Sequence, residues 1–360
     1  MRHHGPLFLS EVQVMFTTDP LPYENPLKED QITNLVFSGG GILGIAYVGA
    51  MMALDGLHVR QHIENYAGAS AGAINALFGA LDYTPDELNQ EMQKMDFRKL
   101  LDTWLRFNLI KTISGRGRCH WLCDTIPWLL IPLSVWIFDG ICRGRVVERW
   151  LEGVVSNKLK EKYGVGSECS FKQLKEKTGK GLFVLGCELN TRKFAVFSPD
   201  DTPDVRVVDA VVASMSIPFI FSPRCVAGKT YLDGGTTKDM PLDMDFLIRD
   251  DPKKPNPFRP NNTLGLMLNT KDAVANPRPK PLNGHWDWLG ALFDAVLNQG
   301  TMQLFHDQRR IDQTVFIDPK GIEQLDFNLT PEQKQLLKQS AWEAVYGYFK
   351  KPAPGPCPAT

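Results

Sequence analysis

The chain has 360 residues, of which 43% are hydrophobic, and its 40 Lys and Arg residues almost balance its 41 Asp and Glu residues. This length and hydrophobic content suffice for one large α/β domain, or for two ordinary ones, with a substantial core. The formal net charge of -1 at pH 7 excludes a chain whose overall charge attracts nucleic acid or a membrane surface. We therefore expect a globular protein that has no nucleic-acid partner and whose electrostatic attractions are local.

The number and placement of the cysteines favour reduced thiols and an intracellular setting, because the count is odd and a chain of this length needs no disulfide staples. Cys119 and Cys123 flank His120, but no second ligand pair follows at a zinc spacing, so we expect no metal site. No apolar run reaches 18 residues and the N-terminal run Leu7–Leu9 is short, which predicts neither a transmembrane helix nor a signal peptide. The seven cysteines are Cys119, Cys123, Cys142, Cys169, Cys187, Cys225 and Cys357.

The first ordered elements are expected after a flexible leader of residues 1–30, which is polar, contains prolines and lacks a sustained hydrophobic period. The apolar stretch Asn34–Phe37 predicts a short strand. Gly44–Leu57 has the length and the small apolar residues of a buried helix. The glycines between these two stretches predict a unit of strand, glycine turn and helix.

A second unit of this kind follows, with a strand that ends at Ala67 and an alanine-rich helix at Ala71–Leu81. Thr84 and the proline after it are typical of the N-cap and first position of another helix. The alternation of strands and helices predicts an α/β fold with a mainly parallel sheet between helices. Later expected elements are strands at Leu182–Leu189 and Phe194–Phe197, a helix at Asp209–Met215, surface loops at Arg249–Asn262 and Ala275–Asn283, and a capped helix from Thr330 to about Phe349.

The stretch Val36–Ala46, VFSGGGILGIA, carries a glycine pattern with two interpretations. Gly39, Gly41 and Gly44 fit G-x-G-x-x-G, the fingerprint of a loop that binds a dinucleotide pyrophosphate. The same backbone N–H groups at a helix N-terminus can instead stabilise an oxyanion that develops during a reaction. Glycines alone do not distinguish the two.

The second unit of strand, turn and helix favours the interpretation in which the glycine loop stabilises an oxyanion. Gly68-Ala69-Ser70-Ala71-Gly72 fits G-x-S-x-G between a strand and a helix, where a sharp turn projects the serine hydroxyl above the sheet edge. A dinucleotide fold needs an acid at the end of this strand, and Glu64 precedes the apolar end instead. Ser70 is therefore a candidate nucleophile, with N–H groups of Gly39–Gly41 as donors to its oxyanion.

The base that activates Ser70 has two kinds of candidate. His285 and His306 fit the Ser, Asp, His order of ordinary α/β-hydrolases, yet neither follows a recognisable strand. Asp233 ends the short apolar run Tyr231-Leu232 and precedes two glycines, which allow a sharp turn that brings a carboxylate to another loop. An Asp-Gly pair is also an ordinary turn signal.

Three motifs in one order are more specific than any one of them: Gly39-Gly40-Gly41-Ile42-Leu43-Gly44, Gly68-Ala69-Ser70-Ala71-Gly72, and Asp233-Gly234-Gly235. With Ala213-Ser214-Met215-Ser216-Ile217-Pro218-Phe219 before the aspartate, the chain resembles the patatin-like phospholipase family from about Thr33 to its C-terminal helix. The resemblance implies a three-layer α/β/α sandwich, no cofactor, and a Ser–Asp dyad without histidine. It makes Ser70 the nucleophile, Asp233 the base and Gly39, Gly40 and Gly41 the oxyanion hole, supported by Gly44, Gly68, Gly72, Gly234 and Gly235.

The resemblance also implies a substrate class, because the family hydrolyses acyl esters of phospholipids and neutral lipids. Many bacterial and plant members have Lys or Arg where this chain has Leu43, whereas the adiponutrin-type animal lipases are similar to it there. The head-group preference and the need for an activator protein therefore stay open. We expect a lipid acyl hydrolase of the phospholipase A or lysophospholipase type, cytoplasmic and peripherally associated with a membrane surface that carries its glycerolipid substrate.

The expected domain spans residues 31–350, followed by a flexible tail of residues 351–360. Three alternatives stay open: a Ser-Asp-His esterase that uses His285 or His306, a catalytically silent lipid-binding relative, and a nucleotide-binding relative. An apolar insertion at about residues 104–150 contains the most apolar segment, Cys119–Cys142. Its Trp121, Trp128 and Trp136 are candidates for membrane contact, because tryptophan favours the membrane interface and arginines border the segment.

Overall fold

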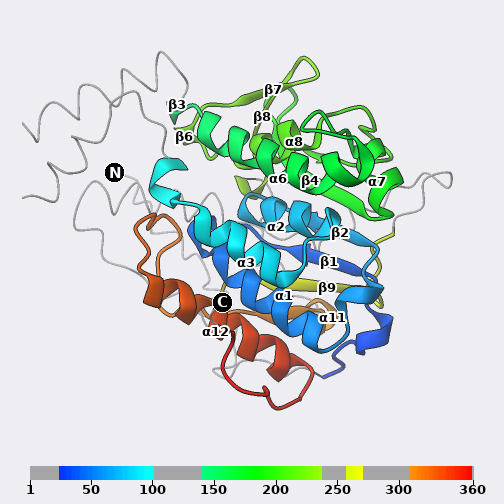
Figure 1. Cartoon of the computed structure of the whole chain (residues 1–360), viewed down its shortest axis with the longest axis vertical. Coiled ribbons are helices and arrows are strands. Elements are labelled where there is room, and N and C mark those ends of the chain that lie inside the picture. Colours follow the sequence, from blue (N-terminus) through cyan, green and yellow to red (C-terminus); the bar gives the residue numbers. More distant parts are fainter. Residues whose placement is uncertain (1–23, 101–139, 237–256, 271–307, 359–360) are drawn as a thin grey trace, which may run out of the picture.

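The computed structural model describes residues 24–100, 140–236, 257–270 and 308–358, and these form a mixed α/β fold around a central sheet (Figure 1). The sequence predicted this fold class, and it is confirmed. Neighbouring parallel strands make up the larger part of the sheet. In sheet order they are β10 (Thr314–Phe316), β9 (Thr263–Met267), β1 (Asn34–Phe37), β2 (Asn65–Gly68) and β4 (Gly181–Glu188).

Antiparallel strands extend the sheet beyond β4. The strand β8 (Lys229–Asp233) pairs with β4, and β7 (Arg224–Val226) pairs with β8. The strand β5 (Lys193–Phe197) also pairs with β4. A separate parallel pair joins β3 (Gly140–Cys142) to β6 (Phe219–Phe221). The sheet is therefore parallel through its middle and antiparallel on the side that carries Asp233.

The helices pack along this sheet, and Figure 1 shows α3, α1 and α12 beside one another while α2 lies against β1, β2 and β4. Short 3₁₀ turns connect several of them. The helices are α1 (Ala46–Gly56), α2 (Ala71–Ala80), α3 (Pro85–Lys94), α6 (Arg145–Tyr163), α7 (Phe171–Thr178), α8 (Val207–Ser214), α11 (Gln308–Asp312) and α12 (Pro331–Tyr348). The 3₁₀ turns are η1 (Glu29–Gln31), η2 (Gly41–Ile45), η3 (Arg60–His62), η4 (Phe97–Leu100) and η5 (Gly234–Thr236).

Burial explains why the central strands have almost no polar alternation. Every residue of β1, β2, β4 and β9 is buried, as expected for parallel strands covered on both faces. All ten residues of α2 are buried as well, so this helix lies inside the core. The turn η2, which follows β1, and the helix α2, which follows β2, are therefore held in place by packing from several sides.

Several predicted boundaries are confirmed. The strand at Asn34–Phe37 occurs as predicted, and Thr84 and Thr330 cap α3 and α12 by accepting hydrogen bonds from the backbone N–H groups three residues later. The helix predicted from Gly44 begins differently. A 3₁₀ turn, η2, comes first and α1 starts at Ala46, because the chain must first turn through positive φ at Gly40 and Gly41.

Parts of the two segments that the sequence assigned to a flexible leader and tail contact the domain. The N–H groups of Glu24 and Asn25 donate to the buried carboxylate of Asp312, at 2.8 and 2.9 Å. In the tail, Cys357 is buried, and Trp342 Nε1 donates to the carbonyl of Gly355 at 3.1 Å. Residues outside the predicted limits are therefore hydrogen bonded to residues inside them. The domain limits of 31–350 stay a prediction.

Three further expectations concern membrane-spanning helices, metal sites and the cysteines. Of the helices in the described ranges, none is long and apolar enough to cross a membrane. Within the same ranges, no group of three or more His, Cys, Asp or Glu residues is placed to hold a metal ion. Among the described cysteines, Cys169, Cys225 and Cys357 are free thiols.

Candidate active site

Ser70 lies in a sharp turn between β2 and α2, where its backbone has φ 53° and ψ -125°. A positive φ is uncommon for a residue with a side chain and indicates a strained turn held by its surroundings. The Ser70 N–H donates to Ser214 Oγ at 2.9 Å. Glycines flank the turn because a Cβ on Gly68 would lie 2.3 Å from the backbone of Gly72, and one on Gly72 would lie 2.4 Å from the carbonyl oxygen of Phe37. The G-x-S-x-G stretch therefore forms the strand-to-helix elbow that the sequence predicted.

The register of the sheet brings Asp233 toward this elbow. The strand β4 pairs with β2 through Val184 and Gly68, and two residues further on it pairs with β8 through Gly186 and Asp233. Asp233 is the last residue of β8 and has 0% of its surface exposed. A short turn follows, and in it the N–H of Gly235 donates to Asp233 Oδ1 at 2.8 Å. Ser70 and Asp233 thus approach from opposite sides of β4.

The environment of Asp233 changes its acidity. Complete burial raises the pKa of this carboxyl from 3.8 to about 7, because a charge loses its hydration there. Hydrogen bonding from the Ser70 side chain and from the Gly235 N–H acts in the opposite direction and lowers the pKa. A carboxyl with a pKa near 7 exchanges a proton readily at neutral pH, as a general base requires.

The glycine loop follows β1, which pairs with β2 through Phe37 and Gly68, so the loop lies next to the Ser70 elbow. Gly40 has φ 150° and Gly41 has φ 54°. A Cβ on Gly41 would lie 2.3 Å from the carbonyl oxygen of Gln324, which makes glycine necessary there. Among the described residues, none accepts a hydrogen bond from the N–H groups of Gly39, Gly40 or Gly41. These donors can therefore face a developing negative charge.

Buried side chains at the end of β1 hold the loop in place. Tyr47, on α1, donates its hydroxyl to the carbonyl of Ser38 at 2.9 Å, and the Ser38 hydroxyl donates to the carbonyl of Gly39 at 2.9 Å. The N–H of Leu268 donates to Ser38 Oγ at 3.3 Å, which ties the loop to the chain beyond β9. Sequence reasoning did not identify Ser38 or Tyr47, because their role depends on contacts between α1, β1 and β9.

The last residue of α8 and the segment after it contact Ser70 and Asp233. Ser214 accepts the Ser70 N–H, and the carbonyl of Ser216 accepts the Asp233 N–H at 3.0 Å. This explains why Ala213-Ser214-Met215-Ser216 accompanies the other motifs. Ion pairs hold α8 in turn: Asp209 bonds to Arg224 of β7 at 3.0 Å, and Arg224 also pairs with Glu148 of α6.

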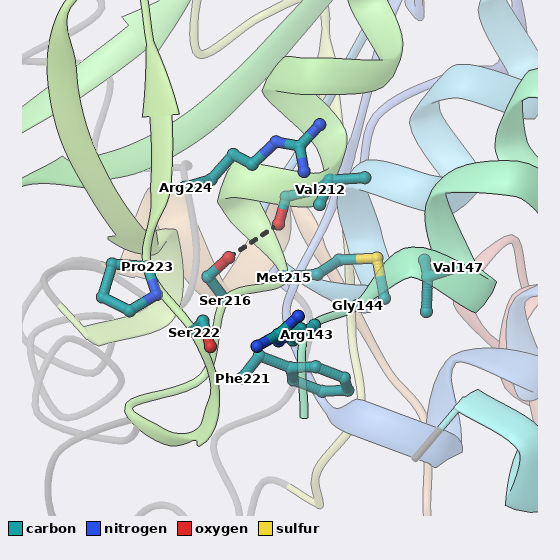
Figure 2. A pocket seen from close by; sticks show the side chains of 10 residues that line it. All are labelled: Arg143, Gly144, Val147, Val212, Met215, Ser216, Phe221, Ser222, Pro223 and Arg224. Carbon is teal, nitrogen blue, oxygen red and sulfur yellow. Dashed lines mark hydrogen bonds between the residues drawn. The ribbon is translucent and has the colours of Figure 1, made fainter. Parts of the chain in front are cut away.

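A small cavity of about 50 Å³ lies beside the same segment (Figure 2). Val147, Val212, Met215 and Phe221 provide much of its apolar wall, and Figure 2 shows Ser216 bonded to the Val212 carbonyl at its edge. Neither Ser70 nor Asp233 lines this cavity, so it is a neighbour of the site and not the site itself. Its ten lining residues are Arg143, Gly144, Val147, Val212, Met215, Ser216, Phe221, Ser222, Pro223 and Arg224.

The remaining sequence candidates separate into two groups. His285, His306, Trp121, Trp128 and Trp136 all lie outside the described residues. Glu64, the acid that a dinucleotide site would need, is exposed and precedes the first residue of β2. Because β1 and β2 are parallel, Glu64 lies at the opposite end of this strand pair from the glycine loop. This position counts against a dinucleotide-binding site.

Two of the supporting glycines, Gly44 and Gly234, lie where the chain packs closely. A Cβ on Gly44 would lie 2.9 Å from the Cβ of Ala71, and one on Gly234 would lie 2.4 Å from the carbonyl oxygen of Leu185. Both positions therefore allow a close approach that a larger residue would prevent. Gly235 contributes its N–H to Asp233, as described above.

The fold and these motifs define a mixed α/β protein with a serine elbow, a glycine loop and a buried aspartate at one end of a parallel sheet. Residues 35–246 match the sequence model of the family described as patatin-like phospholipase. This match covers more than half of the chain and includes Ser70 and Asp233. The chain therefore belongs to the patatin-like phospholipase family.

Individual relatives extend the similarity. An uncharacterized protein of Acanthamoeba polyphaga mimivirus is 26% identical over 325 residues, which are 89% of this chain and 94% of that protein. A protein of Invertebrate iridescent virus 6, named probable lipid hydrolase 463L, is 29% identical over 62% of this chain and 66% of its own length. The crystal structure of VipD from Legionella pneumophila has the same fold, with a TM-score of 0.54 and 16% identity over 89% of this chain and 67% of that chain. Family membership and the second viral relative together support lipid hydrolase activity.

Proposed function

We propose that this protein is a glycerolipid acyl hydrolase of the phospholipase A or lysophospholipase type, with Ser70 as nucleophile and Asp233 as general base. One observation carries the proposal. A serine in a strained elbow lies across β4 from a fully buried carboxyl whose pKa burial raises to about 7. Family membership and the relative named as a lipid hydrolase support the substrate class.

In the first half of the reaction, Asp233 takes the proton of the Ser70 hydroxyl while Ser70 Oγ attacks the ester carbonyl carbon. The carbonyl oxygen becomes negative and receives hydrogen bonds from the N–H groups of Gly39–Gly41. Removing one such donor from a hydrolase costs about 100- to 1,000-fold in rate, so this loop is a large contributor to catalysis. The tetrahedral intermediate then collapses, the lipid alcohol leaves with the proton from Asp233, and the acyl group stays on Ser70.

In the second half, water replaces the serine as nucleophile. Asp233 takes a proton from the water, whose oxygen attacks the acyl carbon, and the glycine loop again holds the oxyanion. Collapse releases the fatty acid and returns the proton to Ser70. The scheme needs a base with a pKa near the working pH, and burial of Asp233 provides it without a histidine.

The tryptophans of the apolar segment belong to this proposal as membrane contacts. Substrate must be drawn from a lipid surface, and Trp121, Trp128 and Trp136 are residues that favour the membrane interface. We therefore propose a cytoplasmic protein that associates peripherally with membranes. The arginines that flank the segment would attract anionic head groups.

The test combines an active-site probe with product analysis. Wild type and Ser70→Ala are treated with a fluorophosphonate probe, and the products from mixed phospholipid vesicles are identified by mass spectrometry. We expect wild type to be labelled and to release fatty acid and lysolipid, and Ser70→Ala to do neither. Full activity after replacing both His285 and His306 with alanine supports the dyad, whereas loss of activity in that variant would favour a histidine base.

A further inference from the structure

The helix that follows Ser70 contains one residue that its surroundings do not favour. The sequence of α2 is AGAINALFGA, and Asn75 is its single residue with a polar side chain. The helix is buried along its whole length, and Asn75 has only 1% of its surface exposed. An apolar residue would suit this position better, because burying an amide removes it from water.

Asn75 connects the nucleophile helix to the glycine loop. Its Nδ2 donates to the carbonyl of Ala71 at 3.0 Å and to the carbonyl of Gly44 at 3.3 Å. Ala71 is the residue after Ser70, and Gly44 belongs to the 3₁₀ turn that carries the glycine loop into α1. A single amide group thus bonds to both elements that a serine hydrolase must keep in register.

The other half of the same amide is not satisfied. No described residue donates a hydrogen bond to Asn75 Oδ1, although this atom is buried. An unsatisfied buried acceptor destabilises a protein, so the side chain opposes stability at this atom. Where a residue breaks a local rule of packing at a site, function is the expected reason.

The structure also shows why a bond to Gly44 reaches the proposed oxyanion hole. Within the turn, the N–H of Leu43 donates to the carbonyl of Gly40 at 3.1 Å, so Gly40 and Gly44 belong to one tight turn. Gly44 lies so close to α2 that a Cβ on it would be 2.9 Å from Ala71. The separation between the glycine loop and the Ser70 elbow is therefore set in part by Asn75.

From these contacts we infer that Asn75 is a positioning residue, which fixes the N–H groups of Gly39–Gly41 relative to Ser70 Oγ. The inference rests on the proposed function. Asn75 touches neither substrate nor the reacting atoms and acts through the Gly44 carbonyl. Because the oxyanion forms only in the transition state, loss of this bond will lower kcat and leave KM nearly unchanged.

Two variants separate this role from the general stability of the helix. Asn75→Leu removes both hydrogen bonds while keeping a similar volume. Asn75→Ser keeps a short hydroxyl that reaches the Ala71 carbonyl four residues earlier, but not the Gly44 carbonyl. Asn89→Leu is the matched control, because Asn89 is a buried asparagine of α3 whose Oδ1 accepts from Lys338 Nζ at 3.3 Å, away from the glycine loop.

The assay measures hydrolysis of a short soluble ester, with active sites counted by fluorophosphonate labelling taken to completion. Affinity for a trifluoromethyl ketone, which forms a tetrahedral adduct with serine, is measured beside it. We expect kcat per labelled site to fall about 10- to 100-fold in both Asn75 variants, with KM within about twofold. The affinity of both Asn75 variants for the ketone should fall by a similar factor. The Asn89→Leu variant should keep the wild-type kcat per labelled site.

The inference is overturned if both Asn75 variants keep kcat per site within twofold of wild type, or if only KM changes. It is also overturned if Asn89→Leu loses kcat as strongly, since that would be a general effect of core damage. A wild type that neither hydrolyses the ester nor reacts with the probe would instead overturn the proposed function itself. The wild-type measurement made first therefore separates the two failures.

Discussion

The raised pKa of the buried Asp233 carboxyl predicts that the protein loses stability as the pH rises toward neutral. In the folded chain, burial holds the pKa of Asp233 at about 7, against an ordinary value of 3.8. Between these two values the folded state binds a proton that the unfolded state has lost. Stability contributed by this group is therefore present below about pH 4 and is lost as the pH rises to about 7.

The magnitude follows from the size of the pKa difference. Each pH unit within the window costs about 1.4 kcal/mol, so the full loss is about 4 kcal/mol. Between pH 5 and pH 8 the expected loss is about 3 kcal/mol, because the group stops titrating near pH 7. Asp233→Asn removes the charge while keeping the shape, and its amide oxygen can still accept the Gly235 N–H.

The assay is equilibrium urea unfolding of wild type, Asp233→Asn and Ser70→Ala at pH 5 and pH 8. Comparing the two pH values within each variant cancels groups that titrate alike in all three. We expect wild type to lose about 3 kcal/mol more than Asp233→Asn on going to pH 8. Ser70→Ala, which is also expected to be inactive, should retain the pH dependence because it keeps the carboxyl.

The activity profile should run in the opposite direction. A general base must be ionised, so kcat/KM of wild type should rise with pH and level off above an apparent pKa of about 7. Parallel stability curves for wild type and Asp233→Asn between pH 5 and pH 8 would refute the reasoning, because Asp233 would then carry no raised pKa.

Three further predictions concern strain, packing and membrane contact. Ser70→Gly should be more stable than Ser70→Ala by about 1 kcal/mol in urea unfolding, because glycine relieves the positive φ, and equal stabilities would show an unstrained turn. Gly72→Ala should lower the free energy of unfolding by about 3 kcal/mol, because its Cβ would lie 2.4 and 2.5 Å from two backbone carbonyl oxygens. Gly153→Ala is the control in α6, where a Cβ meets open space, and it should raise the free energy of unfolding by about 1 kcal/mol. Similar effects of the two substitutions would contradict the close packing at Gly72. Trp128→Ser with Trp136→Ser should weaken vesicle binding and vesicle hydrolysis but spare a soluble ester, whereas a joint loss of both activities and of thermal stability would make the segment part of the core.

The sequence predicted those elements whose signals are local. The strand Asn34–Phe37 is followed by glycines that end it, and Thr330 with Pro331 marks the start of α12. In contrast, β9 and β10 were not predicted. Thr263–Met267 and Thr314–Phe316 are short, and they become strands by pairing with β1 and with each other across long stretches of chain.

The same distinction applies to the site. Ser70 and the glycines occur in patterns that predict a turn, and the two glycines after Asp233 made it a candidate. The raised pKa of Asp233 depends on complete burial, which no local pattern encodes. Asn75 was likewise hidden, because its two hydrogen bonds join parts of the chain that meet only after α2 packs against the glycine loop.

The location of the covalent adduct tests the central claim most directly. Wild type is treated with a fluorophosphonate and digested, and the modified peptide is sequenced by mass spectrometry, with Ser70→Ala treated in parallel. The account predicts a single modified residue, Ser70, and neither an adduct nor lipid hydrolysis in Ser70→Ala. An adduct on another residue, or hydrolysis retained at the wild-type rate by Ser70→Ala, would contradict it.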